Sequence, residues 1–205
     1  MDGFWRKHGY KTAMATISLI LLVAIGTIFF ANERESAFPV QGPAAPFELP
    51  DIQGNSVSME NTLGKVRLLY FFFASCPDVC PPTTYMLSRV QAKLQEKQVF
   101  GSEALIIQVT IDPERDTPEA LERYAANFDA DVSGWKFLRG SEAETKQIGE
   151  GYGIFIQKDP ESGNFIHSNM VVMIDRTNQI RKRYSGSDLN EELIANDVLR
   201  LIADE

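Results

Sequence analysis

The longest uncharged, mostly apolar stretch lies close to the N-terminus. Residues 12–31 contain no charged side chain, and about 20 such residues in a helix cross the hydrocarbon core of a bilayer. Three basic residues precede the stretch within residues 1–11, and a Glu-Arg-Glu run follows it. Because positive charge stays on the cytoplasmic side, the pattern predicts a single-pass membrane anchor with a cytoplasmic N-terminus and an extracytoplasmic domain.

A cleaved signal peptide is the alternative interpretation of this stretch. The apolar core of a signal peptide has only about 7 to 15 residues and ends at a small-x-small cleavage site. Phe29-Phe30-Ala31-Asn32 is a poor site of that kind, and no cysteine borders the stretch to accept a lipid. We therefore favour an uncleaved anchor.

The pattern after the anchor is that of one α/β domain. A proline-rich linker is expected at residues 32–45 and the domain at residues 46–205, since proline removes a backbone donor and favours extended chain. Continuous apolar runs predict strands buried on both faces, and amphipathic segments behind Pro or Ser/Thr/Asp predict helices. We expect strands at 66–74, 104–111, 135–138, 152–157, 165–174 and 179–184, and helices at 81–97, 117–128, 142–150 and from about 190 to 203.

This order of elements predicts a thioredoxin-like fold. Right-handed crossovers between parallel strands place helices on both faces of a central sheet, and the last two strands form an antiparallel hairpin. The result is a three-layer α/β/α sandwich with a mixed sheet. The chain has 205 residues, 44% of them hydrophobic, which suits one core. Its net charge of −8 argues against nucleic acid as a partner.

The chain has two cysteines, and both stand between a predicted buried strand and the helix after it. Cys76 and Cys80 therefore lie near free helix-terminal N–H groups, which favour thiolates. Three residues separate the two cysteines, whereas dithiol oxidoreductases usually have Cys-x-x-Cys. A longer loop opens more easily around an ion, and thiolates are soft ligands that select copper(I).

The chain also has two histidines, of which His8 lies on the predicted cytoplasmic flank. His167 is therefore the imidazole on the same side as the cysteines, in the segment that faces the cysteine loop in a thioredoxin fold. Thioredoxins carry a cis-proline there, whereas this chain has Ser168 after the histidine. Two thiolates and one neutral imidazole give a total charge of −1 with copper(I) and 0 with copper(II), so either ion suits the predicted site.

Longer motifs identify the chain as resembling the Sco/SenC family of copper-binding assembly factors for cytochrome c oxidase. Residues 76–81 read CPDVCP and residues 109–118 read VTIDPERDTP, and the similarity covers roughly residues 45 to 190. The resemblance implies that Cys76, Cys80 and His167 bind copper for delivery to the copper-bearing subunit of the oxidase. Many members place aspartate before the histidine, whereas this chain has Ile166, so any hydrogen bond from that aspartate is lost and the tuning of copper affinity or redox potential is in doubt.

Other interpretations remain open. An extracytoplasmic thiol-disulfide reductase could use Cys76 and Cys80 without His167, and a peroxiredoxin-type peroxidase fits less well. A purely structural disulfide would close a very short loop and restrain little chain entropy. Met170 is a soft donor near the histidine, but a methionine in an apolar strand usually belongs to the core.

The second motif has an ordinary structural interpretation of its own. Asp116 or Thr117 can cap the helix that begins at Pro118, and Arg115 can bridge the carboxylates on either side of it. We therefore assign the motif to loop structure, with partner docking as a second possibility.

Overall fold

The computed structural model describes residues 14–24, 38–161 and 163–204. Its contacts divide the chain into two units, with the boundary after Ala37, and each unit is considered by itself. In the first unit, residues 14–24 are helical. The rest of the predicted membrane segment 12–31 and the flank 1–11 lie outside the described residues. Within the described residues, no helix is both long and apolar enough to span a bilayer, so the anchor stays a prediction.

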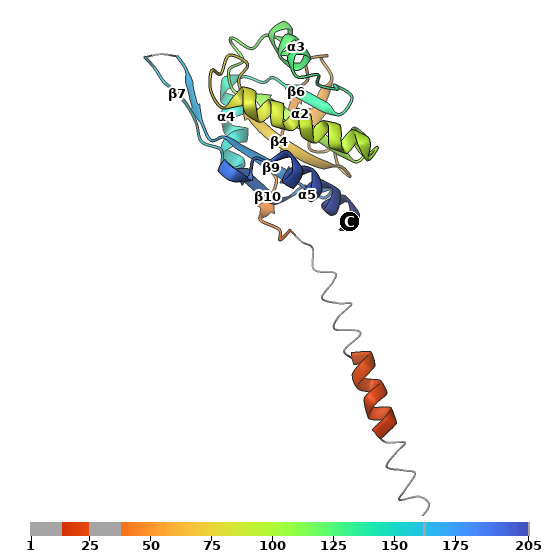
Figure 1. Ribbon diagram of the computed structural model, residues 1–205. Helices are drawn as coiled ribbons and strands as arrows, with labels where there is room; N and C mark the ends of the chain where they lie inside the picture. Colours follow the sequence, from red (N-terminus) through yellow and green to blue (C-terminus); the bar gives the residue numbers. More distant parts are fainter. Residues whose placement is uncertain (1–13, 25–37, 162, 205) are drawn as a thin grey trace, which may run out of the picture. The chain divides into compact units, whose positions relative to one another are not determined.

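A mixed six-stranded sheet forms the centre of the second unit (Figure 1). Its order is β1-β10-β9-β4-β5-β6, with β4, β5 and β6 parallel and the remaining neighbours antiparallel. Two further pairs, β2–β3 and β7–β8, lie outside it. The strands are Gly42–Pro43 (β1), Glu48–Pro50 (β2), Ser56–Ser58 (β3), Val66–Phe72 (β4), Ala104–Thr110 (β5), Trp135–Leu138 (β6), Ile156–Lys158 (β7), Phe165–His167 (β8), Met170–Ile174 (β9) and Gln179–Ser185 (β10).

Helices cover both faces of this sheet. Consecutive side chains of a strand point to opposite faces of the sheet. In β4, the ring of Phe72 packs against Tyr124 of α3, with 5.0 Å between the ring centroids. The ring of Phe71, on the opposite face, lies 6.3 Å from that of Tyr152 at the end of α4. Figure 1 shows α2 and α5 side by side. The predicted α/β fold with a mixed sheet is confirmed. The helices are Cys80–Glu96 (α2), Pro118–Asn127 (α3), Glu142–Gly151 (α4), Glu191–Asp204 (α5) and the short 3-10 helix Gly186–Asp188 (η1).

Two of the predicted strands differ from the structure. The strand expected at 165–174 is interrupted at residues 168–169, so β8 pairs with β7 while β9 joins the central sheet. The strand expected at 152–157 begins only at Ile156, because Tyr152 ends α4 and its buried hydroxyl donates to the Ala45 carbonyl at 2.7 Å. The described part of the segment 32–45 contributes β1 to the sheet edge, and the domain boundary itself stays a prediction.

Candidate metal centre

The cysteine loop connects β4, a strand buried along its whole length, to α2. Cys80 is the first residue of α2, followed by two prolines, which the first helical turn tolerates because its N–H groups have no helical partner. The backbone N–H of Cys76 donates to the Phe73 carbonyl at 3.2 Å and folds the loop back toward the strand. Both thiols are free, with exposed fractions of 7% for Cys76 and 0% for Cys80.

His167 reaches this loop from the end of β8. Its Nε2 lies 3.5 Å from Cys80 Sγ, although 87 positions separate the two residues in the chain. The imidazole meets the Phe73 ring edge-on at 5.9 Å between centroids. Its Nδ1 lies 3.1 Å from the carbonyl oxygen of Ser168, which can only accept a hydrogen bond. Nδ1 therefore carries the proton, and the Nε2 lone pair faces the thiol.

The ionisation of this pair is set mainly by burial. Burial, and then a hydrogen bond in which the Cys80 thiol is the donor to the Cys76 sulfur, raise the pKa of Cys80 to about 12, and the lowering by the Phe73 backbone and Tyr70 is smaller. The expected thiolate at the helix N-terminus is therefore wrong for Cys80, because loss of hydration outweighs the helix dipole. Burial also lowers the pKa of His167 below its ordinary value of 6.5, against a smaller opposing effect of the Ser168 carbonyl. At neutral pH the site holds a thiol and a neutral imidazole.

The three predicted ligands are only partly assembled. Cys80 and His167 are in contact, and Cys76 lies close enough to Cys80 to affect the pKa of its thiol. Across the described part of the chain, however, no three His, Cys, Asp or Glu side chains form a group that could hold a metal ion. For bonds of about 2.0 Å to nitrogen and 2.3 Å to sulfur, as in zinc sites, two ligands of one ion lie about 3.5 to 3.8 Å apart. The Cys80–His167 pair already has that spacing, and Cys76 would have to close on it.

The sequence profile of the SCO1/SenC family matches residues 39–203, which is most of the chain. The chain belongs to the SCO1/SenC family. The crystal structure of a SCO1/SenC family lipoprotein from Bacillus anthracis is 28% identical, with a TM-score of 0.72 over 80% of this chain and 96% of the other. This SCO1/SenC domain therefore matches the family in its sequence profile and a member of the family in its fold.

Two further SCO1/SenC structures are similar and carry functional descriptions of their own. ScoI of Bradyrhizobium japonicum, solved with copper bound, is 27% identical, with a TM-score of 0.66 over 78% of this chain and 99% of the other. BsSco, described as a member of the Sco family of cytochrome c oxidase assembly proteins and studied for a disulfide switch, is 27% identical, with a TM-score of 0.70 over 82% and 99%.

Three residues that the sequence did not single out, Asn169, Tyr70 and Thr83, form a hydrogen-bonded group centred on Asn169, two residues after His167. Asn169 lies in the two-residue interruption between β8 and β9, and its Oδ1 accepts hydrogen bonds from Tyr70 Oη at 3.0 Å and Thr83 Oγ1 at 3.2 Å. Burial, and then the neighbouring Cys80, raise the pKa of Tyr70, so the phenol stays a donor. The sequence offered only a weak signal: a tyrosine inside an otherwise apolar strand needs a hydrogen-bond partner.

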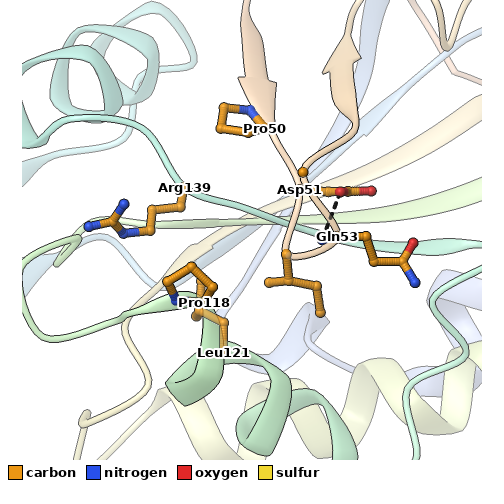
Figure 2. Close-up of a pocket in the computed structure, with 8 residues that line it drawn as sticks. Pro50, Asp51, Gln53, Pro118, Leu121 and Arg139 are labelled. Atoms are coloured by element: carbon orange, nitrogen blue, oxygen red, sulfur yellow. Dashed lines mark hydrogen bonds between the residues drawn. The ribbon is translucent and has the colours of Figure 1, made fainter.

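Pockets occur beside the site and elsewhere on the SCO1/SenC domain. A pocket of about 200 Å³ is lined by Thr83 and Asn169 together with Val79, Pro82, Met86 and Leu189, so its lining includes chain neighbours of Cys80 and His167 but neither of these two residues. Another, of about 350 Å³, lies between the β2–β3 turn and the start of α3 (Figure 2). It is lined by Asp51, Pro118, Leu121 and Arg139 among others, and by none of the predicted ligands.

Proposed function

We propose that this SCO1/SenC protein is a copper chaperone that binds one copper ion through Cys76, Cys80 and His167. The observation that carries the proposal is the 3.5 Å contact between Cys80 Sγ and His167 Nε2, made between residues that are remote in sequence. Thiolate sulfur selects copper(I), and imidazole nitrogen also binds copper well. Copper is the cargo of such a protein, so no chemical turnover is required.

Two features prepare the pair to accept the ion. The hydrogen bond from Nδ1–H to the Ser168 carbonyl leaves the Nε2 lone pair free, and the lowered pKa of His167 keeps the ring neutral at pH 7. Cys80 must lose its proton, because the thiolate is the metal ligand. Loading is therefore coupled to proton release, and protonation of Cys80 favours release of the ion.

The proposed recipient is the copper-bearing subunit of cytochrome c oxidase, reached by ligand exchange at the membrane surface. Support comes from the description of BsSco as an assembly protein of that oxidase. We further propose that residues 12–31 anchor the chain in the cell membrane with the domain on the extracytoplasmic side. The B. anthracis relative is described as a lipoprotein, so membrane attachment in the family need not use a protein helix. Confinement next to a target in the same membrane raises the effective concentration.

A thiol-disulfide reductase is the alternative that the free cysteines support. Thiol exchange needs an accessible thiolate, but Cys80 is fully buried and its pKa is raised to about 12. Copper binding needs the same deprotonation, but there the incoming cation displaces the proton and stabilises the thiolate. The two functions differ in their need for His167, which copper binding uses and thiol exchange does not.

Copper(II) titration of the reduced full-length chain in mild detergent tests the proposal. The wild type should bind one ion and show sulfur-to-copper charge-transfer absorption, and its electron spin resonance spectrum should show nitrogen coupling. His167→Ala should weaken binding strongly and change both spectra. His8→Ala, which removes the other histidine of the chain, should change neither the copper affinity nor the spectra. Identical spectra for the wild type and His167→Ala would refute the ligand assignment.

A further inference from the structure

The hairpin that carries His167 is not part of the central sheet. Among the described residues, β7 and β8 pair with each other and with no further strand, so no backbone ladder there fixes their distance from the cysteine loop. Phe165 of β8 packs toward the core, with a ring centroid 6.0 Å from that of Phe73. The outer part of the hairpin needs other contacts to hold His167 over Cys80.

Arg115 supplies contacts to the tip of this hairpin. Its Nη2 donates to the Gly163 carbonyl at 3.1 Å, and its Nη1 lies 3.5 Å from Oδ1 of Asn164. Its Nε donates to the carboxylate of Asp112, a side chain that is only 2% exposed. One planar guanidinium thus ties a buried anchor in the loop after β5 to the segment that leads into β8.

A second contact from the same loop reaches the other strand of the hairpin. Glu114 forms an ion pair with Lys158 of β7 at 3.1 Å, and Glu142 of α4 pairs with the same ammonium at 2.9 Å. The Lys158 ammonium also lies 5.3 Å from the centre of the Phe165 ring. The loop between β5 and α3 therefore contacts both β7 and the turn that leads into β8.

The same loop also holds the cysteine side of the site. The buried carboxylate of Asp116 accepts a hydrogen bond from the backbone N–H of Ala74 at 3.0 Å, two residues before Cys76, and another from the Thr110 hydroxyl. Arg139 fixes the loop from behind, since its Nη2 donates to the Pro113 carbonyl at 2.8 Å; its side chain lines the pocket in Figure 2.

Capping of α3 does not account for these contacts. The cap is Thr117, whose side chain accepts from the Ala120 N–H, so neither Arg115 nor Asp116 is needed to begin the helix. The side chains at 115 and 116 point instead to the two segments that carry the predicted ligands. The loop after β5 is placed to set the distance between them.

We propose that residues 112–116 hold the two halves of the copper site in register, and that Arg115 is a positioning residue that acts through His167. The proposal rests on the copper-binding function proposed above and deepens it. The hydrogen bonds of Arg115 go to Asp112, Gly163 and Asn164, so it holds the segment that leads to the histidine. Because its side chain is 43% exposed, its contribution is limited, and we expect its loss to weaken copper binding about tenfold.

The test compares copper affinity and spectra of Arg115→Gln with those of the wild type, in the reduced full-length chain. Arg115→Gln should bind about tenfold more weakly, with its copper(II) spectra shifted toward those of His167→Ala. Arg123→Gln, an identical charge change at an exposed position of α3, is the matched control and should match the wild type. Arg115→Lys keeps the charge but not the planar set of donors, and its copper affinity should fall between those of Arg115→Gln and the wild type.

The double variant Arg115→Gln/His167→Ala separates positioning from a general loss of structure. If Arg115 acts through His167, the double variant should bind copper as His167→Ala does, with no additional loss. Additive losses, or wild-type spectra in both Arg115 variants, would overturn the proposal. If Arg115→Gln does not fold, Arg115→Lys decides by the same spectra. Failure of the wild type itself to bind copper would instead refute the proposed function.

Discussion

Removing the Asn169 side chain should destabilise the domain, and the size of the loss can be estimated from the two hydrogen bonds that this side chain accepts. Its Oδ1 is the acceptor for two hydroxyls, those of Tyr70 and Thr83, which are 0% and 4% exposed. A buried donor left without a partner costs about 1–3 kcal/mol. Thr83 borders a pocket of about 200 Å³ that can admit water, whereas Tyr70 does not line it. We therefore expect Asn169→Ala to lower the free energy of unfolding by about 2–3 kcal/mol.

A double-mutant cycle identifies the contact responsible. Tyr70→Phe leaves Asn169 with Thr83 as donor and should cost about 1 kcal/mol. The double variant Tyr70→Phe/Asn169→Ala should be no less stable than Asn169→Ala alone, because no unpaired phenol remains. The coupling energy should be about 1 kcal/mol.

Urea unfolding of the reduced full-length chain, followed by circular dichroism, measures these differences. For a domain of this size, a loss of about 2–3 kcal/mol lowers Tm by about 4–12 °C. Asn127→Ala, at an exposed position in α3, is the control and should stay within about 0.5 kcal/mol of the wild type. A loss below about 0.5 kcal/mol for Asn169→Ala, or additive effects in the cycle, would refute the reasoning.

Three further predictions follow from the ionisation of the site. The folded pKa of His167 lies below 6.5, so its contribution to stability is present above pH 6.5 and is lost as the pH falls through the lowered pKa. Urea unfolding at a series of pH values should therefore show a smaller loss of stability toward acid pH for His167→Ala than for the wild type. The folded pKa of Cys80, about 12, exceeds its ordinary value of 9.0, so its contribution to stability is present below pH 9 and is lost as the pH rises toward 12. Cys80→Ser should therefore lose less stability at alkaline pH than the wild type. An unchanged dependence of stability on pH would contradict the raised pKa of Cys80. Copper(I) loading at pH 7 should release at least one proton per ion, measured with a pH indicator, and oxidation of Cys76 and Cys80 to a disulfide should abolish both binding and release.

The regular elements around the site were predictable because their patterns are local. β4 and β5 are buried on both faces, so continuous apolar runs marked them to within two residues, and the predicted bounds of β6 are those of the structure. Pro118, preceded by a threonine cap, marked the start of α3. Each of these signals lies within the element that it predicts.

The details that assemble the site depend on contacts distant in sequence. The interruption between β8 and β9 was not predicted, because residues 165–174 are apolar at both ends and suggest one continuous strand. Its conformation depends on the hydrogen bonds that Asn169 accepts from Tyr70 and Thr83, which lie 99 and 86 positions away in the chain. The ionisation of Cys80 was misjudged for a similar reason. A helix N-terminus is visible in the sequence, but the complete burial that outweighs it results from tertiary packing.

The ligand set itself is tested most directly by X-ray absorption spectroscopy of the copper(I)-loaded, reduced full-length chain. We predict two sulfur neighbours and one nitrogen neighbour of imidazole type, with the nitrogen signal lost in His167→Ala and one sulfur lost in Cys76→Ser or Cys80→Ser. A wild-type spectrum with sulfur neighbours alone, unchanged by His167→Ala, would contradict the proposal that Cys76, Cys80 and His167 together bind copper.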